Sequence, residues 1–261
     1  MADGEPPDRH ATKIGGLPYR PASAPWPRLP GNIPLVFLAQ FNFCDSQDLT
    51  GKLPGDVLLV FTEEPWSPGY LHFEWQPLGM GDLVEPTSVP EPLGDVELEA
   101  FRRDKERFGP IHQKLNRMGI ELPDEIPHPT NCLAPCYGHV CRVDSFPEAR
   151  PRDENWTGAT CRGKQVAQEL ALLSYQATQI GEAPFFIQEI SDRLLPGRVL
   201  CTISSVQPAF DKPYPWINRP QPLDALGQRP GRDDHFTVLD MGCIYISIDK
   251  KGKLHWQEEC Y

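Results

Sequence analysis

ATKIGGLPYR at residues 11–20 is the stretch that decides the fold, because a similar stretch, ATQIGEAPFF, recurs at residues 177–186. Five of the ten residues are identical, and all five are separated by the same offset of 166. That offset also relates the Leu-Pro-Gly sequences at 29–31 and 195–197, each of which precedes an apolar run. Self-similarity at one offset is the sequence signature of a repeated structural unit. The sequence therefore predicts an internal duplication.

Apolar runs bounded by turn residues follow the opening stretch of each copy and predict β-strands. In the first copy these runs are PLVFLAQFNF at 34–43, GDVLLVF at 55–61 and GYLHFEW at 69–75, the last two forming a hairpin. The second copy has short strands near 185–188 and 199–206 and a closing hairpin, MGCIYISI and LHWQEE, with Gly252 in its turn. The two hairpins are similar in order and composition.

Apolar residues at helical spacing occur mainly in the connection between the two copies. Residues 94–109 predict a helix that breaks or kinks at Pro110, and the segment from Lys164 to Gln176 predicts an amphipathic helix. The 30 prolines exclude an all-helical chain, since proline ends or kinks a helix. We therefore expect an α+β fold with a mainly antiparallel β-sheet built from the internal duplication and a few helices in the connections.

The domain limits follow from the same pattern. Residues 1–10 predict a disordered polar tail, and residues 11–261 predict a single globular domain. The two β-rich repeats span about 11–93 and 177–261, and a helical and proline-rich connection joins them.

The chain is acidic, with 36 acidic and 25 basic residues and a net charge of −11. This balance disfavours nucleic acid as a partner, because an acidic surface repels phosphates. No apolar run is long enough to span a membrane and no apolar leader follows Met1, so we expect a cytoplasmic protein without membrane contact. In that compartment the eight cysteines are expected to be free thiols or part of a metal site rather than disulfides.

Several of these motifs resemble those of one family. The YwqG-like family, a domain family of unknown function, has segments similar to TKIGGLPY at 12–19, WPRLPGNIPLVFLAQFN at 26–42, PCYGHVCRVDSFPEA at 135–149, IGEAPFFIQ at 180–188 and the ending at 239–261. The resemblance implies an internally duplicated α+β fold and suggests a binding or immunity-like role, without an established activity. The second copy departs from the family pattern, because Gln179 and Glu182 stand where Lys and Gly are usual.

A cluster of soft metal ligands is the first candidate site. Cys132, Cys136, His139 and Cys141 supply the thiolates and the imidazole that a tetrahedral zinc site requires. Their spacing departs from the two pairs typical of zinc sites, so the alternative is a group of free thiols in a proline-rich segment. Zinc at this cluster is the only cofactor that the sequence suggests.

A cleft between the two repeats is the second candidate site, because exposed aromatic side chains commonly anchor peptides and partner loops. The candidate binding residues are Tyr19, Gln40, Trp75, Phe186, Gln188, Gln207 and Trp256. Their alternative role is structural, with the aromatic rings in the core and the glutamines in an amide network between the copies.

Two smaller features have both a functional and a structural interpretation. Gly15 and Gly16, after Lys13, have the composition of a backbone nest for an anion, whereas the alternative is that the glycines serve turn geometry. His72 and His255 occupy comparable places in the two hairpins, either as bases or as residues at the rim of a sheet.

These observations favour a non-catalytic module that binds an unknown protein or a small ligand. An acidic protein suits a basic partner, such as a toxin domain. The alternative function is a metal-assisted or hydrolytic enzyme that uses the Cys/His cluster at 132–141.

Overall fold

A computed structural model of the chain describes residues 2–133, 135–137, 178–181, 195–205, 238–239 and 242–260. Its strands are β1 (Ala2–Asp3), β2 (Lys13–Ile14), β3 (Arg28–Leu29), β4 (Ile33–Pro34), β5 (Val36–Asn42), β6 (Val57–Thr62), β7 (Leu71–Gln76), β8 (Cys136–Tyr137), β9 (Gln179–Ile180), β10 (Arg198–Ser204), β11 (Cys243–Ile248) and β12 (Leu254–Glu259). Its α-helices are α1 (Gln47–Thr50), α2 (Asp95–Arg103) and α3 (Lys105–Arg117), and two short 3₁₀ turns are η1 (Cys44–Ser46) and η2 (Pro86–Ser88). In these ranges no helix has the length and apolar character needed to cross a membrane.

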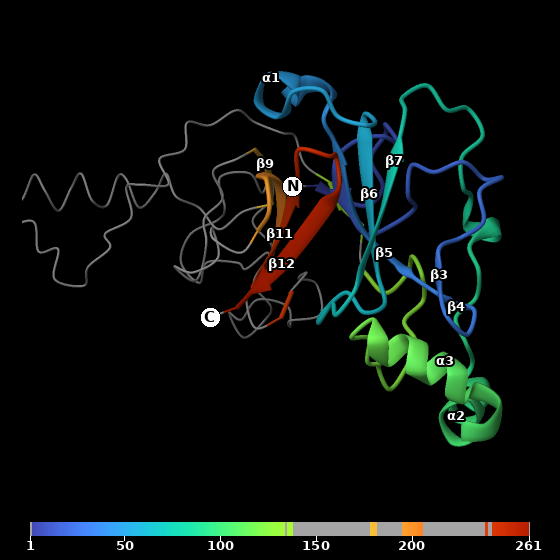
Figure 1. The fold of residues 1–261 in the computed structure, drawn as a ribbon. Helices are drawn as coiled ribbons and strands as arrows, with labels where there is room; N and C mark the ends of the chain where they lie inside the picture. The colour runs from blue at the N-terminus through green and yellow to red at the C-terminus, as the bar shows by residue number, and fades with distance from the viewer. Residues whose placement is uncertain are drawn as a thin grey trace, which may run out of the picture.

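The strands form two main antiparallel sheets (Figure 1). The first sheet has the order β1-β8-β2-β5-β6-β7, and the second sheet has the order β12-β11-β10-β9. Strands β3 and β4 form a separate pair. The predicted α+β class with antiparallel pairing is therefore confirmed, with two sheets rather than one.

The two sheets share a run of four strands in the same order, β2-β5-β6-β7 in the first sheet and β9-β10-β11-β12 in the second. The hairpin β6–β7 pairs Val57 with Gln76 at one end, and the hairpin β11–β12 pairs Cys243 with Glu259 at the corresponding end. Each hairpin has six such pairs. In the preceding strands β5 and β10, the pairing register shifts once, near the start of the strand.

Strand pairing also shows which residue of the second sheet occupies the position of Gln40. Gln40 pairs with Lys13 of β2, and Thr202 pairs with Gln179 of β9. Thr202 therefore stands where Gln40 stands, at an offset of 162 rather than 166, whereas Gln207 lies outside the described residues. The offset changes because strand β4 separates Gly31 from β5, while Gly197 directly precedes β10.

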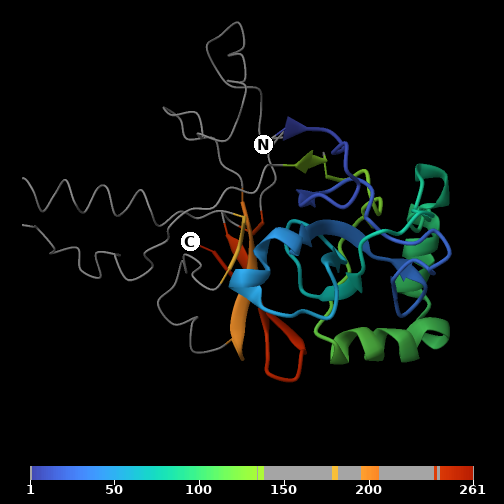
Figure 2. The ribbon, with the colours of Figure 1, turned by 90° about the horizontal axis from the view of Figure 1, so that it is seen from above.

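Two hydrophobic clusters make up most of the described core. The first cluster combines side chains of both sheets and includes Leu38, Phe41, Leu58, Leu200, Ile203, Ile244 and Ile246. The second cluster packs the first sheet against α2 and α3 and includes Phe37, Leu59, Phe61, Leu98, Phe101 and Leu115. The first sheet therefore lies between the second sheet and the helices (Figure 2). Residues 57–61 of β6 are all apolar because alternate residues of a strand point to opposite faces, and here both faces are buried.

Helices α2 and α3 correct the predicted position of the helix break. The break falls at Asp104, whose side chain accepts a hydrogen bond from the Arg107 backbone N–H and so caps α3. Pro110 lies inside α3, where its missing N–H removes one intrahelical hydrogen bond near the start of the helix. The helix predicted from Lys164 to Gln176 falls outside the described residues.

The N-terminal segment also differs from expectation, because residues 2–10 have defined contacts instead of forming a disordered tail. Strand β1 pairs with β8, which in turn pairs with β2. Beyond β1, the side chain of Glu5 contacts Lys13, and the Arg9 carbonyl accepts a hydrogen bond from the Gln40 side chain. Backbone pairing and long-range polar contacts therefore hold a segment that has little apolar surface of its own.

Candidate functional site

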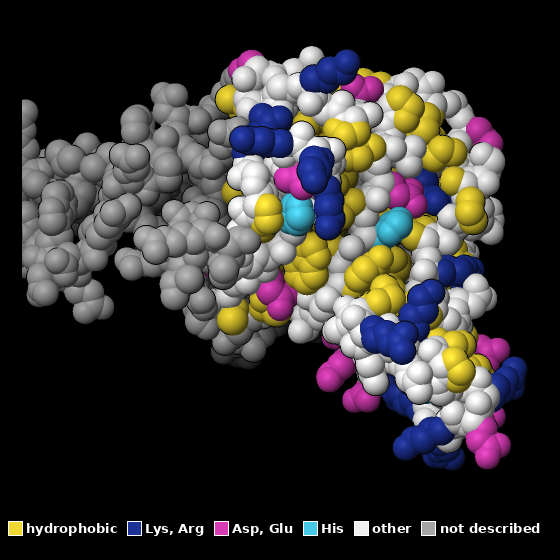
Figure 3. All heavy atoms as spheres, viewed as in Figure 1, with side chains coloured by type: hydrophobic (Ala, Val, Ile, Leu, Met, Phe, Trp, Pro, Cys, Tyr) yellow, Lys and Arg dark blue, Asp and Glu magenta, His cyan; other side chains and the backbone are white. Residues whose placement is uncertain are grey.

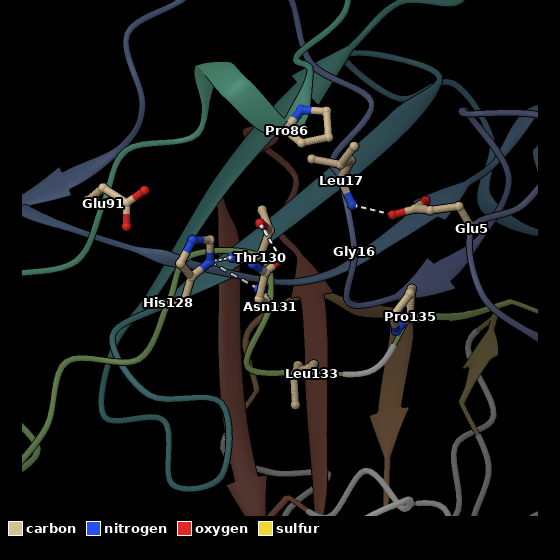
Figure 4. A pocket seen from close by; sticks show the side chains of 10 residues that line it. All are labelled: Glu5, Gly16, Leu17, Pro86, Glu91, His128, Thr130, Asn131, Leu133 and Pro135. Atoms are coloured by element: carbon tan, nitrogen blue, oxygen red, sulfur yellow. Dashed lines mark hydrogen bonds between the residues drawn. The ribbon is translucent and has the colours of Figure 1, made fainter.

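A cavity of about 480 Å³ opens beside β2, where the N-terminal segment, the turn after β2 and residues 128–135 meet (Figure 4). Its lining comprises Glu5, Gly16, Leu17, Pro86, Glu91, His128, Thr130, Asn131, Leu133 and Pro135. Cavities of this size with a few convergent polar groups are the usual form of small-molecule sites. This cavity is therefore the candidate functional site.

One wall of the cavity holds a carboxylate in a backbone nest. Gly15 and Gly16 have φ angles of 65° and 74°, and the turn that they form aims the Leu17 backbone N–H at Glu5 Oε1, 2.5 Å away. Lys13 Nζ donates to Glu5 Oε2 at 2.5 Å and to the Leu17 carbonyl at 2.5 Å. A Cβ atom at Gly16 would overlap the Glu5 carboxylate, so only glycine leaves room for it there. We call the Lys13 side chain with the backbone of residues 15–17 the Lys13 nest.

The charge balance of this wall depends on Glu5. The Lys13 side chain is fully buried, whereas the Glu5 side chain is 35% exposed. Burial lowers the pKa of Lys13, and the hydrogen bond and negative charge of Glu5 offset part of that change. A buried ammonium without an adjacent anion is strongly unfavourable, so the Lys13 nest requires a negative group.

The opposite wall carries an imidazole and a second carboxylate. His128 Nδ1 accepts hydrogen bonds from the backbone N–H groups of Thr130 and Asn131, both at 3.2 Å. A neutral ring that accepts at Nδ1 carries its proton on Nε2, which is then a hydrogen-bond donor. Figure 4 shows Glu91 and Glu5 on opposite sides of the cavity, with His128 between them. The cavity thus presents donors and acceptors to a polar ligand.

Tyr19 and Gln40 of the predicted cleft lie together in the interior, away from this cavity. Gln40 Oε1 accepts from the Tyr19 backbone N–H at 2.9 Å, and Gln40 Nε2 donates to the carbonyls of Arg9 and Ala11. The Tyr19 hydroxyl accepts from the Met80 backbone N–H at 3.0 Å. Both side chains are buried and already hydrogen-bonded, which fits a structural role.

Trp75 and Trp256 of the predicted cleft are half-buried and pack against the first cluster. They lie on β7 and β12, the edge strands of the two sheets. Hydrophobic side chains gather over the seam between these strands in Figure 3. Phe186, Gln188 and Gln207 are outside the described residues, so the structure places only part of the predicted group.

The predicted metal cluster is also only partly described. Cys132 and Cys136 are half-buried and pack against the first cluster, while His139 and Cys141 lie outside the described residues. Burial raises the pKa of the Cys132 thiol to about 12, which keeps it protonated at neutral pH in the metal-free chain. Within the described ranges no group of three His, Cys, Asp or Glu side chains is arranged to hold a metal ion.

The two strand histidines differ in their partners. His72 Nε2 lies 3.4 Å from Glu74, whose carboxylate also accepts hydrogen bonds from Arg20. His255 Nε2 lies 3.1 Å from Asp249 in the hairpin turn. Both therefore belong to ion-pair networks at the outside of the hairpins and not to the cavity.

The sequence drew attention to one wall of the cavity and not to the other. Gly15 and Gly16 have the positive φ angles of the turn geometry that was one interpretation of this pattern, and anion binding, the other interpretation, stays a prediction. Glu5 was missed because it belongs to a segment that the sequence predicts as a tail. Glu91, His128 and Asn131 come from connections without periodicity, so no local pattern could have indicated that they share a cavity.

Comparison with known families gives a match in the first part of the chain. Residues 12–74 match the model of a domain of unknown function, DUF1963, which is the YwqG-like family, so the resemblance is confirmed for this segment. The matched segment runs from the start of β2, with the Lys13 nest, into β7. No curated protein is significantly similar to the chain.

Proposed function

We propose that the protein is a non-catalytic binding module and that the cavity beside β2 is its ligand site. The observation that carries this proposal is the preformed Lys13 nest in the cavity wall, which holds a carboxylate through two donors. The ionisable groups around it have structural partners: Glu5 is bound to Lys13, and His128 Nδ1 to two backbone N–H groups. Groups held in this way fix the position of a ligand and are poorly placed to transfer a proton to it.

We further propose that the two four-strand runs derive from one duplicated unit and that only the first copy binds. Their common strand order, their matching six-pair hairpins and the paired positions of His72 and His255 support the duplication. At the position of Lys13 the second run has Gln179, and in the sequence Glu182 replaces Gly16. A glutamate in that position would repel an anion, so the second copy lacks the features of the nest.

An enzyme that uses the Cys/His cluster at 132–141 is the alternative. Its nucleophilic form has less support, because the raised pKa of Cys132 disfavours nucleophilic attack by this thiol. A zinc content near one ion per chain that falls on Cys136→Ser would support the alternative over the binding module.

The binding proposal is tested by thermal shift with a panel of amino acids, organic acids, amines, sugars and nucleotides. We expect at least one class to raise the melting temperature of the wild-type chain in a saturable manner, since a ligand stabilises the folded state to which it binds. Asn131→Trp, which places a large ring in the cavity wall, is expected to abolish that shift.

The matched control is Asn116→Trp, an equally exposed asparagine on α3 outside the cavity. Its ligand response should equal that of the wild type. The proposal is wrong if no class of compound stabilises the wild type, or if the response persists unchanged in Asn131→Trp.

A further inference from the structure

We propose that the Lys13 nest is the binding site for the carboxylate of a ligand, and that Glu5 fills it as a tethered substitute. This inference rests on the proposed function and names its ligand class. Glu5 is then a built-in competitor that a carboxylate-bearing ligand displaces from the nest.

The donor geometry selects a carboxylate. Lys13 Nζ faces one oxygen of Glu5 and the Leu17 N–H faces the other, each at 2.5 Å. Two donors that engage two oxygens of one planar group match a carboxylate, and charge-assisted hydrogen bonds of this kind are among the strongest in proteins. Gly16, with its positive φ and no Cβ, leaves room for these oxygens, since an added Cβ would lie 2.1 Å from Glu5 Oε1 and 2.8 Å from Pro135 Cβ.

The buried charge of Lys13 is not a requirement of the strand pairing. At the corresponding position of the second sheet, Gln179 pairs with β10 in the same way as Lys13 pairs with β5. A neutral side chain therefore suits this position in the sheet. The first sheet instead carries a buried ammonium, whose desolvation must be offset by an anion at all times. Glu5 supplies that anion when no ligand is present.

Glu5 is placed to exchange with a ligand. Its side chain is 35% exposed and lines the cavity, and it belongs to the N-terminal segment rather than to a long strand. A ligand with its carboxylate in the nest would extend into the cavity toward Glu91 and His128 (Figure 4). The Glu91 carboxylate favours a cationic group at the other end, so an amino-acid-like ligand fits the charge of both walls.

Because Glu5 is part of the chain, its competition with an external carboxylate for the Lys13 nest should change when Glu5 is substituted. An attached competitor acts at a high effective concentration, so the intact chain binds an external carboxylate weakly. Removing the competing carboxylate should strengthen binding by the factor with which Glu5 outcompetes the ligand. The space that Glu5→Ala leaves beside Lys13 admits a small carboxylate in either case, so the distinguishing result is binding of a carboxylate to the wild type, which a purely structural ion pair would not show.

The experiment uses propionate, which has the terminal carboxylate of a glutamate side chain, with sodium chloride at equal ionic strength as the control. We expect propionate to bind Glu5→Ala at least tenfold more tightly than the wild type, measured by thermal shift and by the Leu17 amide resonance. Glu5→Gln should fall between them, because its amide oxygen still accepts from Leu17 without the charge. The double variant Glu5→Ala/Lys13→Met should not respond. If Glu5→Ala unfolds at low salt, refolding by propionate but not by chloride is the same result.

The inference is overturned if propionate has no greater effect than chloride on the wild type or on Glu5→Ala, or if the double variant responds equally. Inorganic phosphate in place of propionate shows whether the nest prefers another anion, and a preference for phosphate would contradict the assignment to carboxylates. A panel compound that still stabilises the wild type and fails with Asn131→Trp would preserve the binding function with a different ligand class. Failure of both experiments would reject the cavity as a site.

Discussion

The hairpin β6–β7 of the first sheet and the hairpin β11–β12 of the second have the same register but different polar residues. Phe73 and Trp256, which occupy corresponding positions and pack against the first cluster, are apolar in both. On the opposite face, Glu74 of β7 corresponds to Gln257 of β12, and on the face of the first cluster Trp75 of β7 corresponds to Glu258 of β12. The two hairpins therefore share their strand pairing and part of their apolar face, but they carry charged side chains at different positions.

The polar residues also differ between the first two strands of each four-strand run, β2 and β5 in the first sheet and β9 and β10 in the second. Lys13 and Gln40 of the first sheet correspond to Gln179 and Thr202 of the second. The first sheet uses these residues to hold the N-terminal segment, because Lys13 binds Glu5 and Gln40 binds the carbonyls of Arg9 and Ala11. The fold thus depends on features that both sheets share, and the cavity depends on features of the first sheet alone.

The largest expected effect comes from Glu74→Gln, which gives the first hairpin the residue of the second. The Arg20 side chain is 4% exposed and donates two hydrogen bonds to Glu74, so its charge would be left buried without a counter-ion, although the carbonyls of Ala24 and Pro25 still accept from it. We expect the free energy of unfolding to fall by about 3–5 kcal/mol in urea titrations at neutral pH. Glu99→Gln is the matched control, because its pair with Arg103 is exposed and should change stability by less than about 0.5 kcal/mol.

A second comparison sets Gln40→Leu against Thr202→Val. Gln40→Leu removes the partners of one backbone N–H and two carbonyls in the interior, and the expected loss is about 3 kcal/mol. The Thr202 hydroxyl is buried and has no hydrogen-bond partner among the described residues, so Thr202→Val should be neutral or stabilising. Chemical denaturation of both variants measures the difference. Equal losses would mean that the two positions are not equivalent in the way strand pairing indicates.

Strands were predictable from the sequence because their signal is local. The apolar runs at 34–43 and 55–61 became β5 and β6, and Gly252 has the positive φ of 81° that the closing turn requires. The helix break was misplaced because the capping side chain of Asp104 determines where α3 begins, and α3 continues through Pro110 despite the hydrogen bond that this proline removes. Glu5 was missed because its position is fixed by contacts with Lys13 and Leu17, which the fold brings close to it. The local sequence around Glu5 does not indicate these contacts.

A third comparison concerns the two Leu-Pro-Gly sequences, which are alike in sequence and differ in surroundings. Gly31 and Gly197 have φ angles of 89° and 85°. A Cβ at Gly197 would overlap the Ile248 carbonyl oxygen in the backbone of β11, whereas a Cβ at Gly31 would meet the Phe101 ring, which can shift. Gly197→Ala should therefore cost about 2–3 kcal/mol, and Gly31→Ala about 1 kcal/mol. Thermal unfolding of the two variants gives the order, and a greater loss for Gly31→Ala would contradict it.

The smallest expected effect concerns Glu258, which stands on β12 where the first sheet has Trp75 on β7. Burial raises the pKa of Glu258, and the negative charge of Glu63 raises it further. The folded chain therefore holds this proton more tightly than the unfolded chain, so stability falls as pH rises from the ordinary carboxyl range through the raised pKa. Glu258→Gln removes that dependence. We expect the variant to exceed the wild type in stability at pH 8 by less than about 1 kcal/mol, since the side chain is half-exposed and solvent screens its charge.

The difference in stability between Glu258→Gln and the wild type should vanish near pH 4, where the Glu258 carboxyl of the wild type is protonated in both the folded and the unfolded chain. Melting temperatures measured from pH 4 to pH 8 test this, with Glu121→Gln, an exposed residue away from β12, as the control with no pH-dependent gain. A constant gain across this range would show that packing, and not charge, distinguishes Glu258 from the tryptophan at the corresponding position of the first sheet. A loss at pH 8 would show that the Glu258 carboxylate has a stabilising partner, and the second sheet would then carry a charged contact of its own.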